Sequence, residues 1–158
     1  MTDNFDTPAR KRTLQSDKYN LHYLKFFGEF LEREGLTTTT AGEKIGLTQV
    51  SVYYWLKKDD ARLSAIAKII EACGYRLIID YVDPSPSSYE IITDQNRPQR
   101  LSFLAEALSG ANKAMVADSL GLGETTVYYW LSHDDIFISY IFKIADILGK
   151  KVRIMVLK

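Results

Sequence analysis

The chain contains an internal repeat, and this feature restricts its possible folds more than any other. The pentapeptide Val52-Tyr53-Tyr54-Trp55-Leu56 recurs as Val127-Tyr128-Tyr129-Trp130-Leu131, at an offset of 75 residues (127 − 52). The same offset pairs further positions, among them Gly46 with Gly121, Asp59-Asp60 with Asp134-Asp135, Ser64 with Ser139, and Gly74 with Gly149. A constant offset through helix-like and turn-like positions indicates that the chain holds two copies of one module.

The limits of the repeat divide the 158 residues into four segments. We expect a flexible N-terminal arm at 1–20, a first copy at 21–82, a linker at 83–100 and a second copy at 101–158. The linker opens with the turn-forming run Asp83-Pro84-Ser85-Pro86. Further along it, Tyr89–Thr93 could add a strand. In the arm, Arg10-Lys11-Arg12 could either reach into a DNA groove or remain solvated.

In the first copy the sequence predicts four helices followed by a strand. Apolar residues at helical spacing begin at Leu21, and Gly35 suits the end of that helix. The segment Thr40-Ala41-Gly42-Glu43 has the form of a capping box, which predicts a short second helix ending near Ile45. The remaining elements are expected to be a third helix over Gln49 to Lys57 with Thr48 as its cap, a fourth over Ser64 to Cys73, and a strand over Tyr75 to Val82.

The second copy follows the same plan. Pro98 can open its first helix, which ends at Gly110, and Asn112 can cap its second. The remaining elements are expected to be a third helix over Glu124 to Leu131, a fourth over Ser139 to Leu148, and a strand over Lys151 to Leu157. The predicted fold class is therefore mainly α, with a small β-sheet.

Each copy ends in a strand, and an isolated strand leaves its backbone N–H and C=O groups without partners. The simplest solution is one antiparallel sheet of Arg76–Val82 and Lys151–Leu157, which would join the copies as a covalent pseudo-dimer. The linker can span roughly 50 Å when extended, so this pairing is geometrically open. The alternative is two independent copies on a flexible linker, with each strand packed on its own helices.

The supply of reactive side chains argues against several kinds of site. Cys73 is the only cysteine, so no intrachain disulfide and no thiolate zinc cluster can form. The only histidines are His22 and His133, which leaves little from which to build a metal site or a Ser-His-Asp triad. We therefore expect no metal, no cofactor and no enzymatic activity.

Hydropathy and charge restrict the location and the partners. No apolar run approaches the roughly 18 residues that a membrane-spanning helix needs. The N-terminus lacks the apolar stretch of a secretory signal, so we expect a cytoplasmic protein without a membrane partner. Lys+Arg and Asp+Glu are both 20, so the net charge is zero. Because a basic balance is absent, any indication of nucleic-acid binding has to come from local pattern.

The second and third helices of each copy, joined through a glycine turn, resemble the helix-turn-helix of the lambda-repressor/Cro family. In that pattern a small residue lies four before the turn glycine, and apolar residues lie six and nine after it. These positions hold Gly42, Gly46, Val52 and Trp55 in the first copy, and Ala117, Gly121, Val127 and Trp130 in the second. The resemblance covers the four-helix part of each copy. Gly42 departs from the commoner alanine, at a cost of about 1 kcal/mol in a helix.

The resemblance implies a sequence-specific regulator of transcription that binds double-stranded DNA, a prokaryotic repressor in kind, with a recognition helix in each copy. As a pseudo-dimer it would hold its two recognition helices about 34–36 Å apart, which matches one turn of DNA. A further homodimer or a protein partner remains open. The alternative function is a helix-turn-helix protein that acts through protein contact, such as an antitoxin or an accessory subunit, and the zero net charge favours it.

The resemblance also implies which residues contact DNA, at the start and along the outer side of each third helix. They are Thr48, Gln49, Val50, Ser51, Tyr53, Tyr54 and Lys57 in the first copy, and Gly123, Glu124, Thr125, Thr126, Tyr128, Tyr129 and His133 in the second. Gln49 could bond adenine through two hydrogen bonds, Val50 could meet a thymine methyl, and Glu124 could accept from cytosine. The four tyrosines could instead be solvated.

Other prominent residues receive a structural interpretation. Trp55 and Trp130 occupy inward positions and are expected to anchor the core. The pairs Asp59-Asp60 and Asp134-Asp135 are expected to act as caps and turn residues rather than as catalytic carboxylates. Cys73 is expected to behave as a small core residue.

Overall fold

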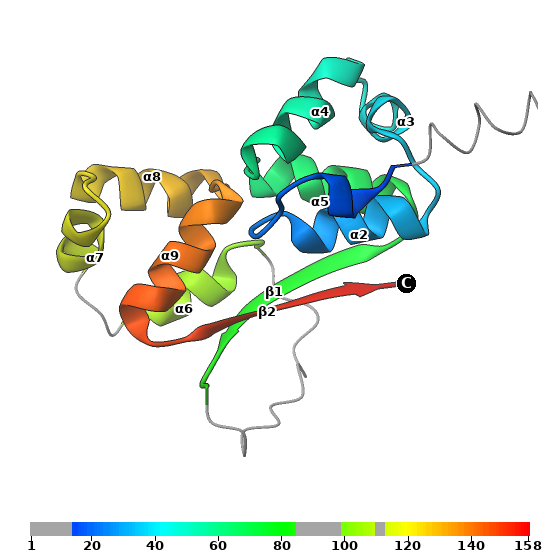
Figure 1. Ribbon diagram of the computed structural model, residues 1–158. Helices are drawn as coiled ribbons and strands as arrows, with labels where there is room; N and C mark the ends of the chain where they lie inside the picture. The colour runs from blue at the N-terminus through cyan, green and yellow to red at the C-terminus, as the bar shows by residue number, and fades with distance from the viewer. Residues whose placement is uncertain (1–13, 85–98, 110–112) are drawn as a thin grey trace, which may run out of the picture.

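The structure of the protein, a computed structural model, describes residues 14–84, 99–109 and 113–158 (Figure 1). In the first copy a short 3-10 helix, η1, precedes four α-helices and a strand. Their bounds are η1 Ser16–Lys18, α2 Lys25–Arg33, α3 Thr38–Glu43, α4 Gln49–Lys58, α5 Leu63–Ala72 and β1 Arg76–Val82. In the second copy the same order recurs as α6 Ser102–Ser109, α7 Lys113–Ser119, α8 Glu124–His133, α9 Ile138–Leu148 and β2 Lys151–Leu157.

Most of the observed boundaries lie close to the predicted ones, but α2 begins at Lys25, four residues after Leu21, and two predicted side-chain caps are not formed. Helix α3 begins after Thr37, whose side chain accepts from the backbone N–H of Thr40 while the Thr40 side chain accepts from that of Thr37. The capping box is therefore Thr37 with Thr40, and the prediction of Thr40 with Glu43 was wrong by three positions. Thr48 precedes α4 in an extended conformation, but its side chain makes no cap hydrogen bond.

The last part of the predicted N-terminal arm, which was expected at 1–20, packs on the first copy. Leu14 is buried, and the backbone N–H of Ser16 donates to the Glu32 carboxylate of α2 at 3.0 Å. Residues 14–20 thus pack on the first copy and do not belong to a free arm. The predicted features at Arg10-Lys11-Arg12, Tyr89–Thr93, Pro98 and Asn112 lie outside the described residues.

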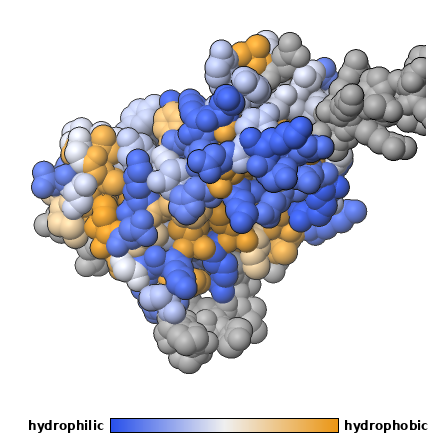
Figure 2. Space-filling view, in the orientation of Figure 1, coloured by the Kyte–Doolittle hydropathy of each residue, from blue (hydrophilic) through white to orange (hydrophobic). Residues whose placement is uncertain are grey.

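The two strands pair with each other in one antiparallel sheet, as predicted, so the alternative of independent strands was wrong. Arg76 lies opposite Leu157, and Val82 lies opposite Lys151. The helices of both copies lie to one side of the strands in Figure 1. Alternate residues of each strand pack against the buried core, namely Leu77, Ile79 and Tyr81 from β1 and Val152, Ile154 and Val156 from β2. Hydrophobic residues reach the surface around the strands, between hydrophilic ones (Figure 2).

The contacts between the copies follow a pseudo-twofold axis. Ile79 pairs with Ile154, which is its own equivalent at the offset of 75 (154 − 79). Arg62 and Phe137 form an isolated antiparallel bridge, and they too are equivalents (137 − 62). When a residue pairs with its own counterpart, the symmetry axis passes between the two. The interface is therefore of the self-complementary kind found in symmetric dimers.

Each copy caps a helix of the other at this axis. Asp60 accepts hydrogen bonds from the backbone N–H of Ser139 at 2.9 Å and from its hydroxyl at 2.6 Å. Asp135 accepts the same pair from Ser64, at 2.9 and 2.6 Å. The residues that precede α5 and α9, Arg62 and Phe137, make no side-chain cap of their own. The first turns of both helices therefore depend on a carboxylate from the other copy.

A half-buried tyrosine adds a further link between the copies. The hydroxyl of Tyr81 on β1 donates to the backbone carbonyl of Ile141 on α9 at 2.6 Å. Its ring meets Phe103 of α6 edge-on, with centroids 5.0 Å apart. Burial raises the pKa of Tyr81 well above its ordinary value. The side chain is thus held neutral at the junction of strand and helices.

Because ionisation of the Tyr81 hydroxyl is disfavoured in the folded state, the free energy of unfolding should fall in alkaline solution. Because its pKa is raised in the folded state, its contribution is complete below the unfolded pKa of about 10 and is lost as the pH rises beyond it. Tyr81→Phe should lower the free energy of unfolding by about 0.5–1.5 kcal/mol at neutral pH and should flatten the alkaline loss. Urea denaturation of both proteins between pH 7 and about 11 measures this. An equally steep alkaline loss in the variant would contradict it.

Candidate nucleic-acid interface

Helices α4 and α8 lie across the molecule from the two strands in Figure 1. A tight turn joins each to the helix before it. Gly46 and Gly121 take φ values of +74° and +72°, a conformation that side chains disfavour. A Cβ on Gly42 of α3 would lie only 3.1 Å from the carbonyl oxygen of Thr48. The absence of a side chain there lets the turn approach α3 closely.

The inner side of each helix is fixed by buried apolar residues. Val52 and Leu56 of α4 and Val127 of α8 are fully enclosed. Trp130 is 5% exposed, as expected of a core anchor. Trp55 is only half-buried against the core, with its ring 6.5 Å from that of Phe27, so the same expectation is met only in part.

The ends of both helices are fixed by aspartates. Asp59 ends α4 with φ of 58°, and its carboxylate accepts from the backbone N–H groups of His22, Tyr23 and Leu24. Asp134 ends α8 with φ of 52° and accepts from those of Arg100 and Leu101. These carboxylates are occupied by backbone donors, which confirms their predicted role as caps and turn residues.

The exposed large hydrophobic side chains gather on the outer sides of α4 and α8 and on the neighbouring α7. Within the described residues, the large hydrophobic side chains that are exposed are Val50, Tyr53, Tyr54, Met115, Tyr128 and Tyr129. All lie on α4, on α8 or on α7, which precedes α8. Tyr54 and Tyr128 are 59% and 54% exposed. Exposed side chains of this size, gathered on α4, α7 and α8, make the outer sides of these helices a candidate surface for binding a partner.

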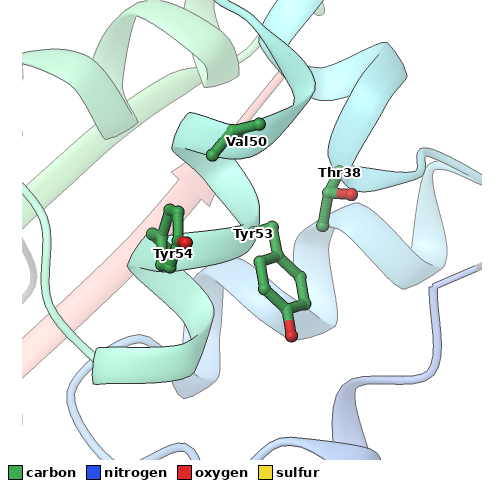
Figure 3. Close-up of a pocket in the computed structure, with 4 residues that line it drawn as sticks. All are labelled: Thr38, Val50, Tyr53 and Tyr54. Carbon is green, nitrogen blue, oxygen red and sulfur yellow. The ribbon is translucent and has the colours of Figure 1, made fainter.

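A shallow pocket of about 360 Å³ opens on this surface in the first copy. It is lined by Thr38 of α3 and by Val50, Tyr53 and Tyr54 of α4. Figure 3 shows Thr38 facing the ring of Tyr53, with Val50 and Tyr54 along the same helix. The rings of Tyr53 and Tyr54 meet edge-on, with centroids 5.7 Å apart.

Cationic groups stand beside the tyrosines. Lys57 Nζ lies 6.0 Å from the ring centroid of Tyr53, and Lys113 Nζ lies 5.8 Å from that of Tyr128. His133 stacks on Tyr129, with ring centroids 3.8 Å apart, and its Nδ1 is 3.0 Å from the Tyr129 carbonyl oxygen. Each copy thus places nitrogen donors among exposed aromatic rings.

The structure brings most of the predicted contact residues to this surface. Those exposed to solvent are Thr48, Val50, Tyr53, Tyr54, Lys57, Gly123, Glu124, Thr125, Tyr128, Tyr129 and His133. Ser51 and Thr126 are half-buried. Gln49 is the first residue of α4, and the placement of its side chain lies outside what the structure describes.

The sequence prediction missed the residues that the preceding helices contribute. In the first copy Thr38 of α3 lines the pocket. In the second copy Met115 of α7 is exposed, and Lys113 of α7 lies over the ring of Tyr128. The repeat held the relevant signal, because Thr38 and Lys113 are equivalent positions (113 − 38 = 75). Both residues lie on the second helices, whereas the predicted contact residues lie on or next to the third helices.

The described residues also bear on membrane and metal sites. No helix there is long and apolar enough to span a bilayer. No cluster of three or more histidine, cysteine, aspartate or glutamate side chains there could hold a metal ion. In comparisons with protein families, curated proteins and solved structures, no match to the chain is found.

Proposed function

We propose that this protein is a sequence-specific regulator of transcription, a repressor in kind, that binds double-stranded DNA as a covalent pseudo-dimer. Helices α4 and α8 act as its two recognition helices, in the manner of the lambda-repressor/Cro family. The observation that carries the proposal is the concentration of exposed apolar side chains on α4, α8 and α7, in two copies related by a pseudo-twofold axis. Operators with matching twofold symmetry are the usual targets of such arrangements.

The chemistry of the surface supports this function. Thr48, Val50 and Thr125 are exposed at the starts of the helices, where side chains of this motif meet base edges in the major groove. Tyrosine hydroxyls and lysine ammonium groups next to them are common donors to backbone phosphates. The exposed Glu124 is suited to accept from cytosine N4.

A gel shift on mixed-sequence duplex DNA across a salt series tests the proposal. Phosphate contacts release counterions, so the logarithm of the binding constant should fall linearly with the logarithm of salt concentration. The alternative, a helix-turn-helix protein that binds another protein, is favoured by the pocket lined by Thr38, Val50, Tyr53 and Tyr54, because tyrosine is common at protein interfaces. Failure to shift DNA at any salt concentration would support that alternative.

The two recognition helices should read different half-sites. Gln49-Val50-Ser51 and Glu124-Thr125-Thr126 offer different donors and acceptors at equivalent positions. Gln49→Ala should relax base preference in one half-site only, by about 1–3 kcal/mol for a lost bidentate contact. Selection of bound sequences from a random pool, for wild type and variant, measures this. Identical base preferences in the two halves for the wild type would contradict it.

A further inference from the structure

Both copies hold a lysine beside the first tyrosine of the recognition helix, but the lysines come from different elements. In the first copy Lys57 lies one helical turn after Tyr53 on α4. In the second copy the position equivalent to Lys57 is Ser132 (57 + 75), and the cation is supplied by Lys113 at the start of α7. The distances from Nζ to the ring centroid are 6.0 and 5.8 Å.

This correspondence does not follow from the repeat of the sequence. The position equivalent to Lys113 is Thr38, so neither lysine has a lysine as its counterpart. Among the cation–aromatic contacts between described residues, these two alone fall on equivalent aromatic rings. The cation beside this tyrosine is retained although the residue that supplies it differs.

The geometry explains how a lysine at either of two sequence positions can lie beside the first tyrosine of the recognition helix. Thr38 lines the same pocket as Tyr53 and faces its ring (Figure 3). Its counterpart Lys113 is the residue found over the ring of Tyr128. A side chain at the start of α3 or α7, and one on the last turn of α4 or α8, can therefore both reach the first tyrosine of the recognition helix.

The cation–aromatic contacts do not account for the placement of these lysines, although the last turn of α4 suits the charge of Lys57. Tyr53 and Tyr128 are 41% and 54% exposed, and exposed cation–aromatic contacts contribute little to folding. Lys113 also begins a helix, where the helix dipole disfavours a positive charge. A cation held at such a place is better explained by an anionic ligand than by the fold.

We infer that Lys57 and Lys113 contact equivalent backbone phosphates of DNA, each together with its neighbouring tyrosine, in the two half-sites. The inference rests on the proposed DNA-binding function and names the chemistry of its anchoring contacts. The ammonium group and the tyrosine hydroxyl are both hydrogen-bond donors that suit phosphate oxygens. Lys58 does not take this role, because its Nζ lies 6.0 Å from the ring centroid of Phe137 in the other copy.

The test uses the full chain and a mixed-sequence duplex, because phosphate contacts need no operator. Lys57→Ala and Lys113→Ala should each reduce the salt dependence of binding, by about 0.9 in the slope of log K against log salt. Moving the lysine should restore it: Thr38→Lys should rescue Lys57→Ala, and Ser132→Lys should rescue Lys113→Ala. Lys151→Ala, on the strand that lies away from α4 and α8, is the matched control and should leave the slope unchanged.

The outcomes separate this inference from the proposed function. Wild type that binds DNA, with slopes unaffected by Lys57→Ala and Lys113→Ala, would overturn the inference alone. The variants with a moved lysine should also melt at the temperature of wild type. If they do and the slope is still reduced, the equivalence of the two lysines is overturned. Wild type that binds no duplex at any salt concentration would overturn the proposed function and the inference together.

Discussion

Trp130→Ala is expected to lower the free energy of unfolding by about 3–5 kcal/mol, the usual cost of deleting a buried aromatic ring. Trp130 is 5% exposed, and its ring lies 5.1 Å, centroid to centroid, from that of Tyr140 on α9. Its removal would leave a cavity where α8 meets α9. Urea denaturation followed by circular dichroism measures the change.

The equivalent tryptophan provides a matched comparison. Trp55 is only half-buried, so Trp55→Ala removes less buried surface and should cost less than Trp130→Ala. Both substitutions should lower the stability of the fold, and neither should act by removing a contact with DNA alone. An unchanged midpoint for Trp130→Ala would show that this residue does not anchor the core, and equal losses would contradict the difference between the copies.

Replacement of both Asp60 and Asp135 by alanine should destabilise the whole chain by about 2–6 kcal/mol. Each change leaves the N–H and hydroxyl of a serine in the other copy, one buried and one half-buried, without their acceptor, and a polar group left unsatisfied away from solvent costs about 1–3 kcal/mol. The serines affected are Ser139 and Ser64. Denaturant titration of the two single variants and the double variant measures the effect.

The symmetry of the interface sharpens this prediction. Asp60→Ala and Asp135→Ala should each destabilise the chain, because each removes two hydrogen bonds between the copies. Asp146→Ala, at an exposed site on α9, is the control and should change stability little. If the double variant were as stable as the control, the copies would not depend on each other's caps.

The repeat predicted much of the fold because it reports long-range structure. A strand that occurs twice needs a partner, and the second copy supplies one with the same pattern. Arg76–Val82 and Lys151–Leu157 were therefore paired correctly from the requirement for backbone hydrogen bonds. Turn glycines marked helix ends equally well, because Gly46 and Gly121 take positive φ values that other residues disfavour.

The features that escaped prediction depend on contacts that local pattern cannot show. Thr37 and Thr40 cap each other, whereas Thr40 with Glu43 fits the usual capping motif better. The hydrogen bonds that Asp60 accepts from Ser139, and those that Asp135 accepts from Ser64, join residues 79 and 71 positions apart. Lys113 lies outside the third helix and reaches Tyr128 only through the packing of α7 on α8.

Footprinting on a selected DNA site tests the pseudo-dimer most directly. The paired strands and the reciprocal caps hold the two copies in one orientation. We expect two protected half-sites on one face of the duplex, with centres about 10 base pairs apart, and loss of binding when about 5 base pairs are inserted between them. Equal affinity for half-sites at arbitrary spacings would contradict the account, because it would show that the two recognition helices bind DNA independently.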